Sequence, residues 1–251
     1  MQDQNKFNYI IQQADNCLIL GQRLAEWCGH GPVLEQDIAM TNISLDLIGQ
    51  ARLLYQYAAE IQEEGKTEDD LAYLRDAWDF KNVLLVEQAN GDFGKTIFRQ
   101  FLYDTFSCYF YEELMKSTDE RLASIAAKSH KETLYHMKWS GDWVIRLGDG
   151  TEESHDRIQQ AVNELWSYKD EIVTANSVDI KAVAELYGVH LETIKAKRNE
   201  KIRLVMEEAT LTAPDSDYAH QGGKEGVHSE NLGYILADLQ FLQRAYPGNQ
   251  W

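Results

Sequence analysis

The sequence is short of proline, cysteine and positive charge, and each shortage excludes a class of protein. Only 3 prolines occur in 251 residues, which favours long uninterrupted helices because proline breaks a helix interior. The 3 cysteines, Cys17, Cys28 and Cys108, are odd in number and show no CxxC spacing. They predict reduced structural thiols, not a disulfide framework or a zinc site. The net charge of −17 argues against nucleic acid and anionic membranes as partners, since both select basic patches.

Long apolar runs are also absent. No segment approaches 18 uninterrupted apolar residues, so no membrane span is predicted. The first residues lack a basic region followed by an apolar run, so we expect no signal peptide and a cytoplasmic protein. Hydrophobic residues nevertheless make up 44% of the chain, enough for a substantial core. No linker or repeat marks a boundary, so residues 1–251 are predicted to form a single domain.

Apolar residues recur at helical spacing along most of the chain, whereas no alternating strand pattern of useful length occurs. The predicted helices cover 7–28, 34–65, 68–75, 93–117, 119–147, 154–173, 177–188, 192–209 and a last one from Ser229 to Pro247. Four of these helices are long and have short connections, which favours a bundle. The predicted fold class is therefore all-α, a four-helix bundle with additional C-terminal helices.

The second long helix combines apolar and polar residues in an unusual way. Between residues 42 and 60 its apolar side chains go most of the way round, which predicts burial on all sides. Asn42, Asp46 and Gln50 recur every fourth residue and form one polar line. Buried polar groups must be hydrogen-bonded, paired or bound to a metal. The line is therefore a ligand site, the remains of one, or a hydrogen-bond network.

The other long helices also carry polar residues that we expect to point inward. Four-helix di-metal proteins place one acid on each of two helices and a Glu-x-x-His on each of the other two. The corresponding candidates in this chain are Asp15, Asp46, Gln50, Asp104, Glu132 and His136. Neither Glu-x-x-His motif is intact, because Gln50 stands where one histidine is expected and Tyr135 stands three residues after Glu132.

We interpret this set as the remains of a di-iron site whose acids are tied into a hydrogen-bond network. Arg52, Arg99 and Lys131 are the candidate partners for these acids. The alternative is that the chain is itself a di-iron carboxylate oxygenase or oxidase.

Four runs of the sequence closely resemble one known family. They are DNCLILGQRLAEWCGHGPVLEQDIAMTNISLDLIGQAR, LLVEQANGDF, KETLYH and GGKEGVHSENLGYILADLQFLQRAYPGNQW. The chain resembles the structural C subunits of ring 1,2-phenylacetyl-CoA epoxidase complexes, which belong to phenylacetate degradation and are similar to bacterial multicomponent monooxygenases.

The resemblance implies a ferritin-like fold and a place in a hetero-oligomer. Its implied partners are a catalytic ferritin-like A subunit that holds the di-iron centre and a reductase that feeds electrons to the complex. Phenylacetyl-CoA, epoxidised on its ring, would be the substrate of the complex. This chain would then be a structural subunit with no cofactor and no catalytic residue of its own.

The irregular segment 75–82, RDAWDFKN, carries a second functional hypothesis. Asp79, Phe80, Lys81 and Asn82 are candidates for a contact with a CoA tail that the partner mainly binds. The alternative for this segment is an ordinary helix connection or a contact between subunits.

Overall fold

The computed structural model describes residues 3–249, and helices dominate them. No strand occurs in this part of the chain, which confirms the predicted all-α class. The chain groups into two compact units. The first contains the residues up to Ala89 and those from Gln221 onward, and the second contains Asn90–His220. The single domain predicted for 1–251 stays a prediction.

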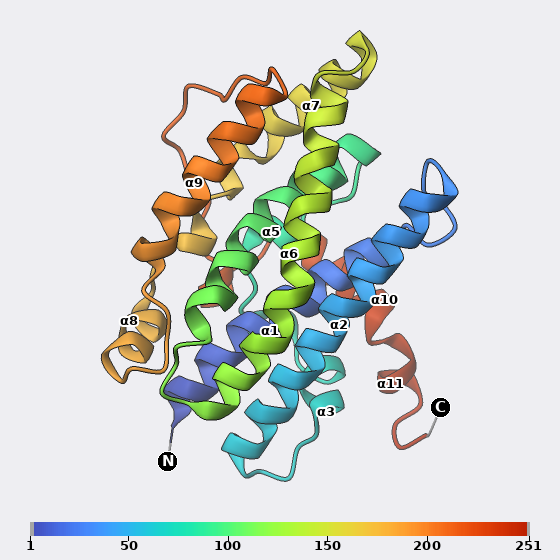
Figure 1. The fold of residues 1–251 in the computed structure, drawn as a ribbon. Helices are drawn as coiled ribbons and strands as arrows, with labels where there is room; N and C mark the ends of the chain where they lie inside the picture. Colours follow the sequence, from blue (N-terminus) through green and yellow to red (C-terminus); the bar gives the residue numbers. More distant parts are fainter. Residues whose placement is uncertain (1–2, 250–251) are drawn as a thin grey trace. The chain divides into compact units, whose positions relative to one another are not determined.

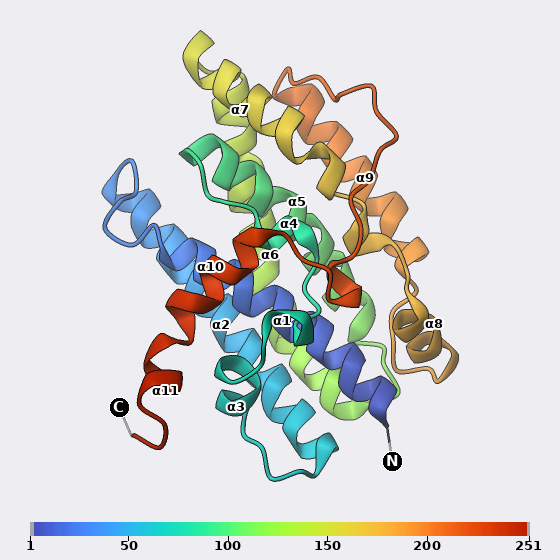
Figure 2. The same cartoon turned by 180° about the vertical axis from the view of Figure 1, so that it is seen from behind.

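The first unit is built on two long antiparallel helices, α1 (Gln4–Ala25) and α2 (Leu34–Gln62), which pack against each other (Figure 1). Three short elements follow them: α3 (Glu68–Tyr73), η1 (Ala77–Asp79) and α4 (Leu84–Glu87). The end of the chain then returns to this unit as η4 (Gly223–Glu225), α10 (Glu230–Leu239) and α11 (Phe241–Ala245). In Figure 2, α10 passes over α1, and it contacts α1, α4 and η1.

The prediction that α2 is buried all round between residues 42 and 60 is wrong. One face is fully buried and includes Ile43, Leu47 and Leu54. On the other side Leu45 is 61% exposed, Asn42 is exposed and Asp46 is half-buried. The physical reason is that packing against a neighbouring helix covers only one stripe of a helix, so the second apolar face of α2 stays open.

The second unit is built on another antiparallel pair, α5 (Phe93–Leu114) and α6 (Glu120–Gly148). The other elements of the unit are α7 (Glu152–Leu165), η2 (Trp166–Tyr168), η3 (Glu171–Val173), α8 (Ser177–Ala184) and α9 (Leu191–Glu208). Helix α5 contacts α6, α7 and α9, and most of its side chains are buried. Its aromatic residues include Phe106 and Phe110, whose stacked rings lie 5.1 Å apart.

Two predicted helices are interrupted where side chains bind backbone carbonyls. The helix predicted over 154–173 ends at Leu165, and the guanidinium of buried Arg198 donates to the carbonyl of Lys169 at 2.7 Å. The last predicted helix breaks into α10 and α11 at Gln240. The Gln240 amide donates to the carbonyls of Ala72 at 3.2 Å and Arg75 at 3.0 Å. Both breaks depend on partners distant in sequence, which periodicity alone does not reveal.

Along residues 3–249, every helix falls short of the length and apolar character that crossing a bilayer requires.

Candidate functional site

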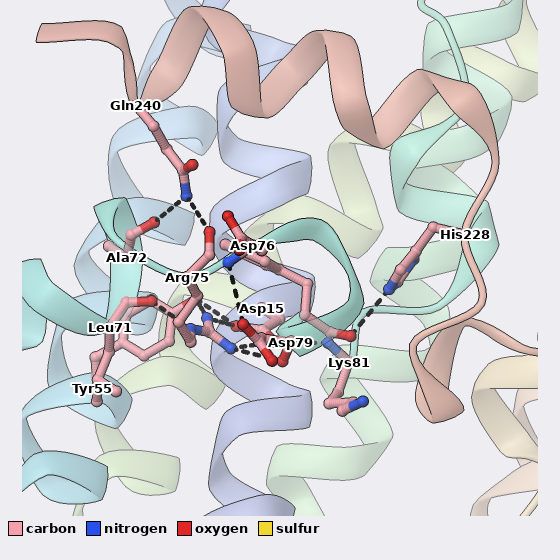
Figure 3. A network of polar contacts seen from close by, with 11 residues as sticks. Asp15, Tyr55, Leu71, Ala72, Arg75, Asp76, Asp79, Lys81, His228 and Gln240 are labelled. Atoms are coloured by element: carbon pink, nitrogen blue, oxygen red, sulfur yellow. Dashed lines mark hydrogen bonds and ion pairs between the residues drawn. The ribbon is translucent and has the colours of Figure 1, made fainter. Parts of the chain in front are cut away.

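Asp15 lies at the centre of a buried polar network in the first unit (Figure 3). Its carboxylate is fully buried. One oxygen accepts a hydrogen bond of 2.5 Å from the Tyr55 hydroxyl, and the other accepts from the Lys81 backbone N–H at 2.7 Å. The Arg75 guanidinium donates to both oxygens. The acid on α1 is therefore fully engaged by protein groups.

Arg75 is held in place on several sides. Its Nε donates to the carbonyl of Leu71 at 2.5 Å, and its guanidinium carbon lies 4.1 Å from the centre of the Phe80 ring. A guanidinium over an aromatic face is attracted by the ring's quadrupole. Since the charge of Asp15 is matched by a bidentate cation, this pair has the strong geometry of a charge-assisted contact.

The segment between α3 and α4 is fixed from its other side by the returning C-terminal part of the chain. His228 bonds the carbonyl of Phe80 through Nε2 at 2.9 Å. The side chains of Gln240 and Arg244 both donate to the carbonyl of Arg75, at 3.0 and 2.8 Å. Figure 3 shows His228 and Gln240 reaching this segment. Residues 75–82 are thus held between Asp15 and the C-terminal residues.

Glu87 is a second fully buried carboxylate in this unit. His228 Nδ1 lies 2.9 Å from one of its oxygens, and the Ser229 backbone N–H donates to the other at 2.7 Å. Because both ring nitrogens of His228 face acceptors, the ring bonds both only as an imidazolium. Burial alone would lower the pKa of His228, but the hydrogen bonds to Glu87 and to the Phe80 carbonyl raise it above its ordinary value.

The three residues of the polar line on α2 become more buried along the helix. Asn42 is exposed, Asp46 is half-buried and Gln50 is buried. The Cys17 thiol donates to Gln50 Oε1 across 3.7 Å. Gln50 therefore contributes to packing between α1 and α2, whereas the hydrogen bonds expected for Asp46 with neighbouring helices stay a prediction.

Asp104 is the buried acid of the second unit, and its surroundings differ from those of Asp15. The Gln100 amide donates to one carboxylate oxygen at 2.7 Å, and the Ser140 hydroxyl donates to the other at 2.7 Å. Burial raises the pKa of Asp104 to about 6, against the opposing effects of His136 and of these two hydrogen bonds. The carboxyl therefore gains and loses its proton at about pH 6.

Glu132 and His136 stand one helical turn apart on α6 but differ in burial. His136 is fully buried, and its ring lies 6.3 Å from that of Tyr135. Glu132 is half-buried. The six candidate positions are divided equally between the units. The first unit contains Asp15, Asp46 and Gln50, and the second contains Asp104, Glu132 and His136.

The residues present do not fit a di-iron centre. Within the described range, no group of three or more His, Cys, Asp or Glu side chains is arranged to hold a metal ion. Asp15 is occupied by a cation that a metal would have to displace, and the amide of Gln50 is a poor iron ligand beside a carboxylate or imidazole. No reaction step through iron is therefore assigned to this chain.

The four candidates for a CoA contact separate into two pairs. Phe80 and Asn82 are fully buried, and the Asn82 amide donates to Glu87 at 3.1 Å. These two side chains therefore serve the fold. Asp79 and Lys81 line an open cleft of about 590 Å³. The CoA contact predicted for the four residues stays a prediction.

Sequence reasoning missed the partners of the buried acids. The arginine that pairs with Asp15 is Arg75, whereas Arg52 pairs with Glu68 near the surface and Arg99 donates to Asn90. Nothing in helical periodicity places residue 75 beside residue 15, because Arg75, predicted as the last residue of the helix over 68–75, lies beyond the end of α3 at Tyr73. The one available signal was a cation within the irregular run RDAWDFKN.

Comparison with known proteins gives two findings. The model of the family described as "Phenylacetic acid catabolic protein" matches residues 1–251. The chain is also similar to the C subunit of the 1,2-phenylacetyl-CoA epoxidase of Escherichia coli (strain K12), with 46% identity over 243 residues. That alignment covers 97% of this chain and 98% of the relative.

Proposed function

Because the chain belongs to the phenylacetic acid catabolic protein family, we propose that it is the non-catalytic structural subunit of a multicomponent di-iron oxygenase that epoxidises the ring of phenylacetyl-CoA. In this role it binds and stabilises a catalytic ferritin-like A subunit in the cytoplasm. The A subunit holds the di-iron centre and receives electrons from the reductase of the complex. The name of the Escherichia coli relative supports membership of such a complex.

The observation that carries the non-catalytic role is the state of Asp15. In a di-metal bundle an inward acid at such a position serves as a ligand. Here both oxygens accept hydrogen bonds from Arg75, Tyr55 or Lys81. Arginine stays protonated in proteins, so this acid keeps a fixed positive partner where iron would need an open oxygen.

The test is to express the chain with its A subunit and to measure iron and epoxidation for each preparation. We expect iron to follow the A subunit and the isolated chain to bind almost none. The A subunit expressed alone is expected to be insoluble or inactive. About two irons per isolated chain, the content of a di-iron bundle, would instead establish this chain as an oxygenase or oxidase. A fully soluble and active lone A subunit would remove the stabilising role.

A further inference from the structure

Helix α2 carries a line of large apolar side chains on its open face. Leu34 is 71% exposed, Ile38 51%, Leu45 61% and Ile48 37%. Together with Thr41 and Arg52 they follow alternating steps of four and three residues. We call Leu34, Ile38, Leu45 and Ile48 the α2 seam. Steps of this kind average 3.5 residues, which is the repeat by which one helix packs along another.

The α2 seam is not part of the core of this chain. The opposite face of α2 is fully buried and includes Met40, Ile43 and Leu47. Single exposed apolar residues are normal on a protein surface, but a contiguous apolar surface marks an interaction site. From Leu34 to Arg52 the line is about 27 Å long at 1.5 Å per residue. That length suits a helix of several turns better than a short peptide or a small molecule.

Between residues 34 and 51, the charges beside the α2 seam are of one sign, and Arg52 at the end of the line is paired with Glu68. Glu35, Asp37 and Asp46 lie among its residues, and no lysine or arginine occurs between residues 34 and 51. Oppositely charged groups beside an apolar helix contact select the partner and its orientation. The complementary surface is therefore a helix with an apolar stripe flanked by lysine or arginine.

We propose that the α2 seam is the docking face for one long helix of the catalytic ferritin-like subunit, with basic residues of that helix beside Glu35 and Asp46. This inference rests on the proposed function and names the surface through which it operates. A helix is the fitting occupant because the seam has the spacing and length of a helix–helix contact. A ferritin-like bundle is built of long helices, whereas a second copy of this chain would bring equally acidic flanks to the contact.

The test introduces a charge into the α2 seam of the tagged chain, which is then expressed together with the catalytic subunit. Leu45→Asp is the main variant, and Ile38→Asp/Leu45→Asp is the stronger one. The matched control is Ile180→Asp, because Ile180 lies on α8 and is 62% exposed. We expect at least about a tenfold loss of co-purified catalytic subunit for Leu45→Asp, since central apolar anchors carry most of an interface's binding energy. The control is expected to retain it.

Folding of each variant is checked by its thermal unfolding without the partner. Leu45 is already exposed, so its replacement is a surface change. The melting temperature of the Leu45→Asp variant should therefore stay within about 2 °C of that of the parent chain. A photo-crosslinking residue at position 42, in an otherwise unchanged chain, gives an independent measurement. It should form an adduct with the catalytic subunit, and the same residue at position 180 should not.

The outcomes distinguish a failure of the docking proposal for the α2 seam from a failure of the proposed function. If the parent chain retains the catalytic subunit and Leu45→Asp retains it equally, the α2 seam is not the docking face and the proposed function stands. If the parent chain retains none, the proposed function fails and this inference fails with it. A crosslink from position 42 to a second copy of this chain would replace the proposed occupant and overturn the inference.

Discussion

The two units treat their buried acids differently. In the first, Asp15 is paired with Arg75, and Glu87 is bonded by the imidazolium of His228. In the second, Asp104 accepts hydrogen bonds from the neutral donors Gln100 and Ser140. The pKa of Asp104 accordingly rises to about 6 through burial.

This difference shows two ways for a protein to keep a carboxyl group in its interior. A cation from another segment fixes the charged form and ties two segments together. Hydrogen bonds from neutral donors offset only part of the cost of burying the charge, so the pKa of the carboxyl stays above its ordinary value. The first arrangement makes local structure depend on one pair, whereas the second makes stability depend on pH.

Removing the cation from the first unit is the strongest test of this comparison. Arg75→Met leaves the Asp15 carboxylate buried without its charge partner, and breaking a buried pair in this way costs about 3–5 kcal/mol. The measurement is the free energy of unfolding from urea titration. Arg52→Met is the control, because Arg52 pairs with Glu68 from a side chain that is 69% exposed. Exposed pairs contribute about 0–1 kcal/mol.

The double variant Asp15→Asn/Arg75→Met sharpens the result. It removes both charges at once, so most of the loss caused by Arg75→Met alone should be recovered. A double variant as unstable as Arg75→Met would show that Arg75 stabilises the unit through packing against Phe80 and not through its charge.

A smaller effect is expected when the acid of the second unit is made neutral. The folded-state pKa of Asp104 lies above its ordinary value, so the folded state binds its proton more tightly. Stability therefore falls as pH rises towards about 6. Between pH 5 and 7.5 the chain should lose about 1 kcal/mol through this group. Asp104→Asn should abolish that part of the pH dependence in urea titrations at both pH values. An unchanged pH dependence would contradict the raised pKa.

The smallest expected effect concerns His228. Its folded-state pKa is raised, so its contribution is complete below the ordinary histidine pKa and is lost as pH rises through the folded value. That loss should be about 1 kcal/mol, the scale of one hydrogen bond. Amide hydrogen exchange over residues 229–239, corrected for the intrinsic effect of pH, should show faster opening at pH 8.5 than at pH 6. In His228→Ala the opening should be faster at both pH values and nearly independent of pH.

Much of the helical fold could be predicted from the sequence because its signals are local. Apolar periodicity located the long helices, although the first one, predicted over 7–28, ends earlier, at Ala25. The breaks at Leu165 and Gln240 could not be predicted. They depend on Arg198 reaching Lys169 and on Gln240 reaching Ala72 and Arg75.

The buried acids of the candidate site could be predicted from the sequence, but the residues that bond them could not. Asp15 and Asp104 were singled out because an acid among apolar residues of a helix must be satisfied. Tyr55, on the predicted second helix, donates to Asp15, yet nothing distinguished it from Tyr57, the other tyrosine of that helix. The open face of α2 was predicted to be buried because periodicity records where apolar residues lie and not which chain covers them.

The return of His228 to Glu87 has a consequence for the order in which the protein is made. On the ribosome the carboxylate of Glu87 emerges well before its imidazolium, because the whole of the second unit, Asn90–His220, is translated in between. At about 5–20 residues per second this delay is on the order of ten seconds. During that interval the Phe80 carbonyl lacks its hydrogen bond from His228. The first unit is therefore the first to begin translation and the last to be completed.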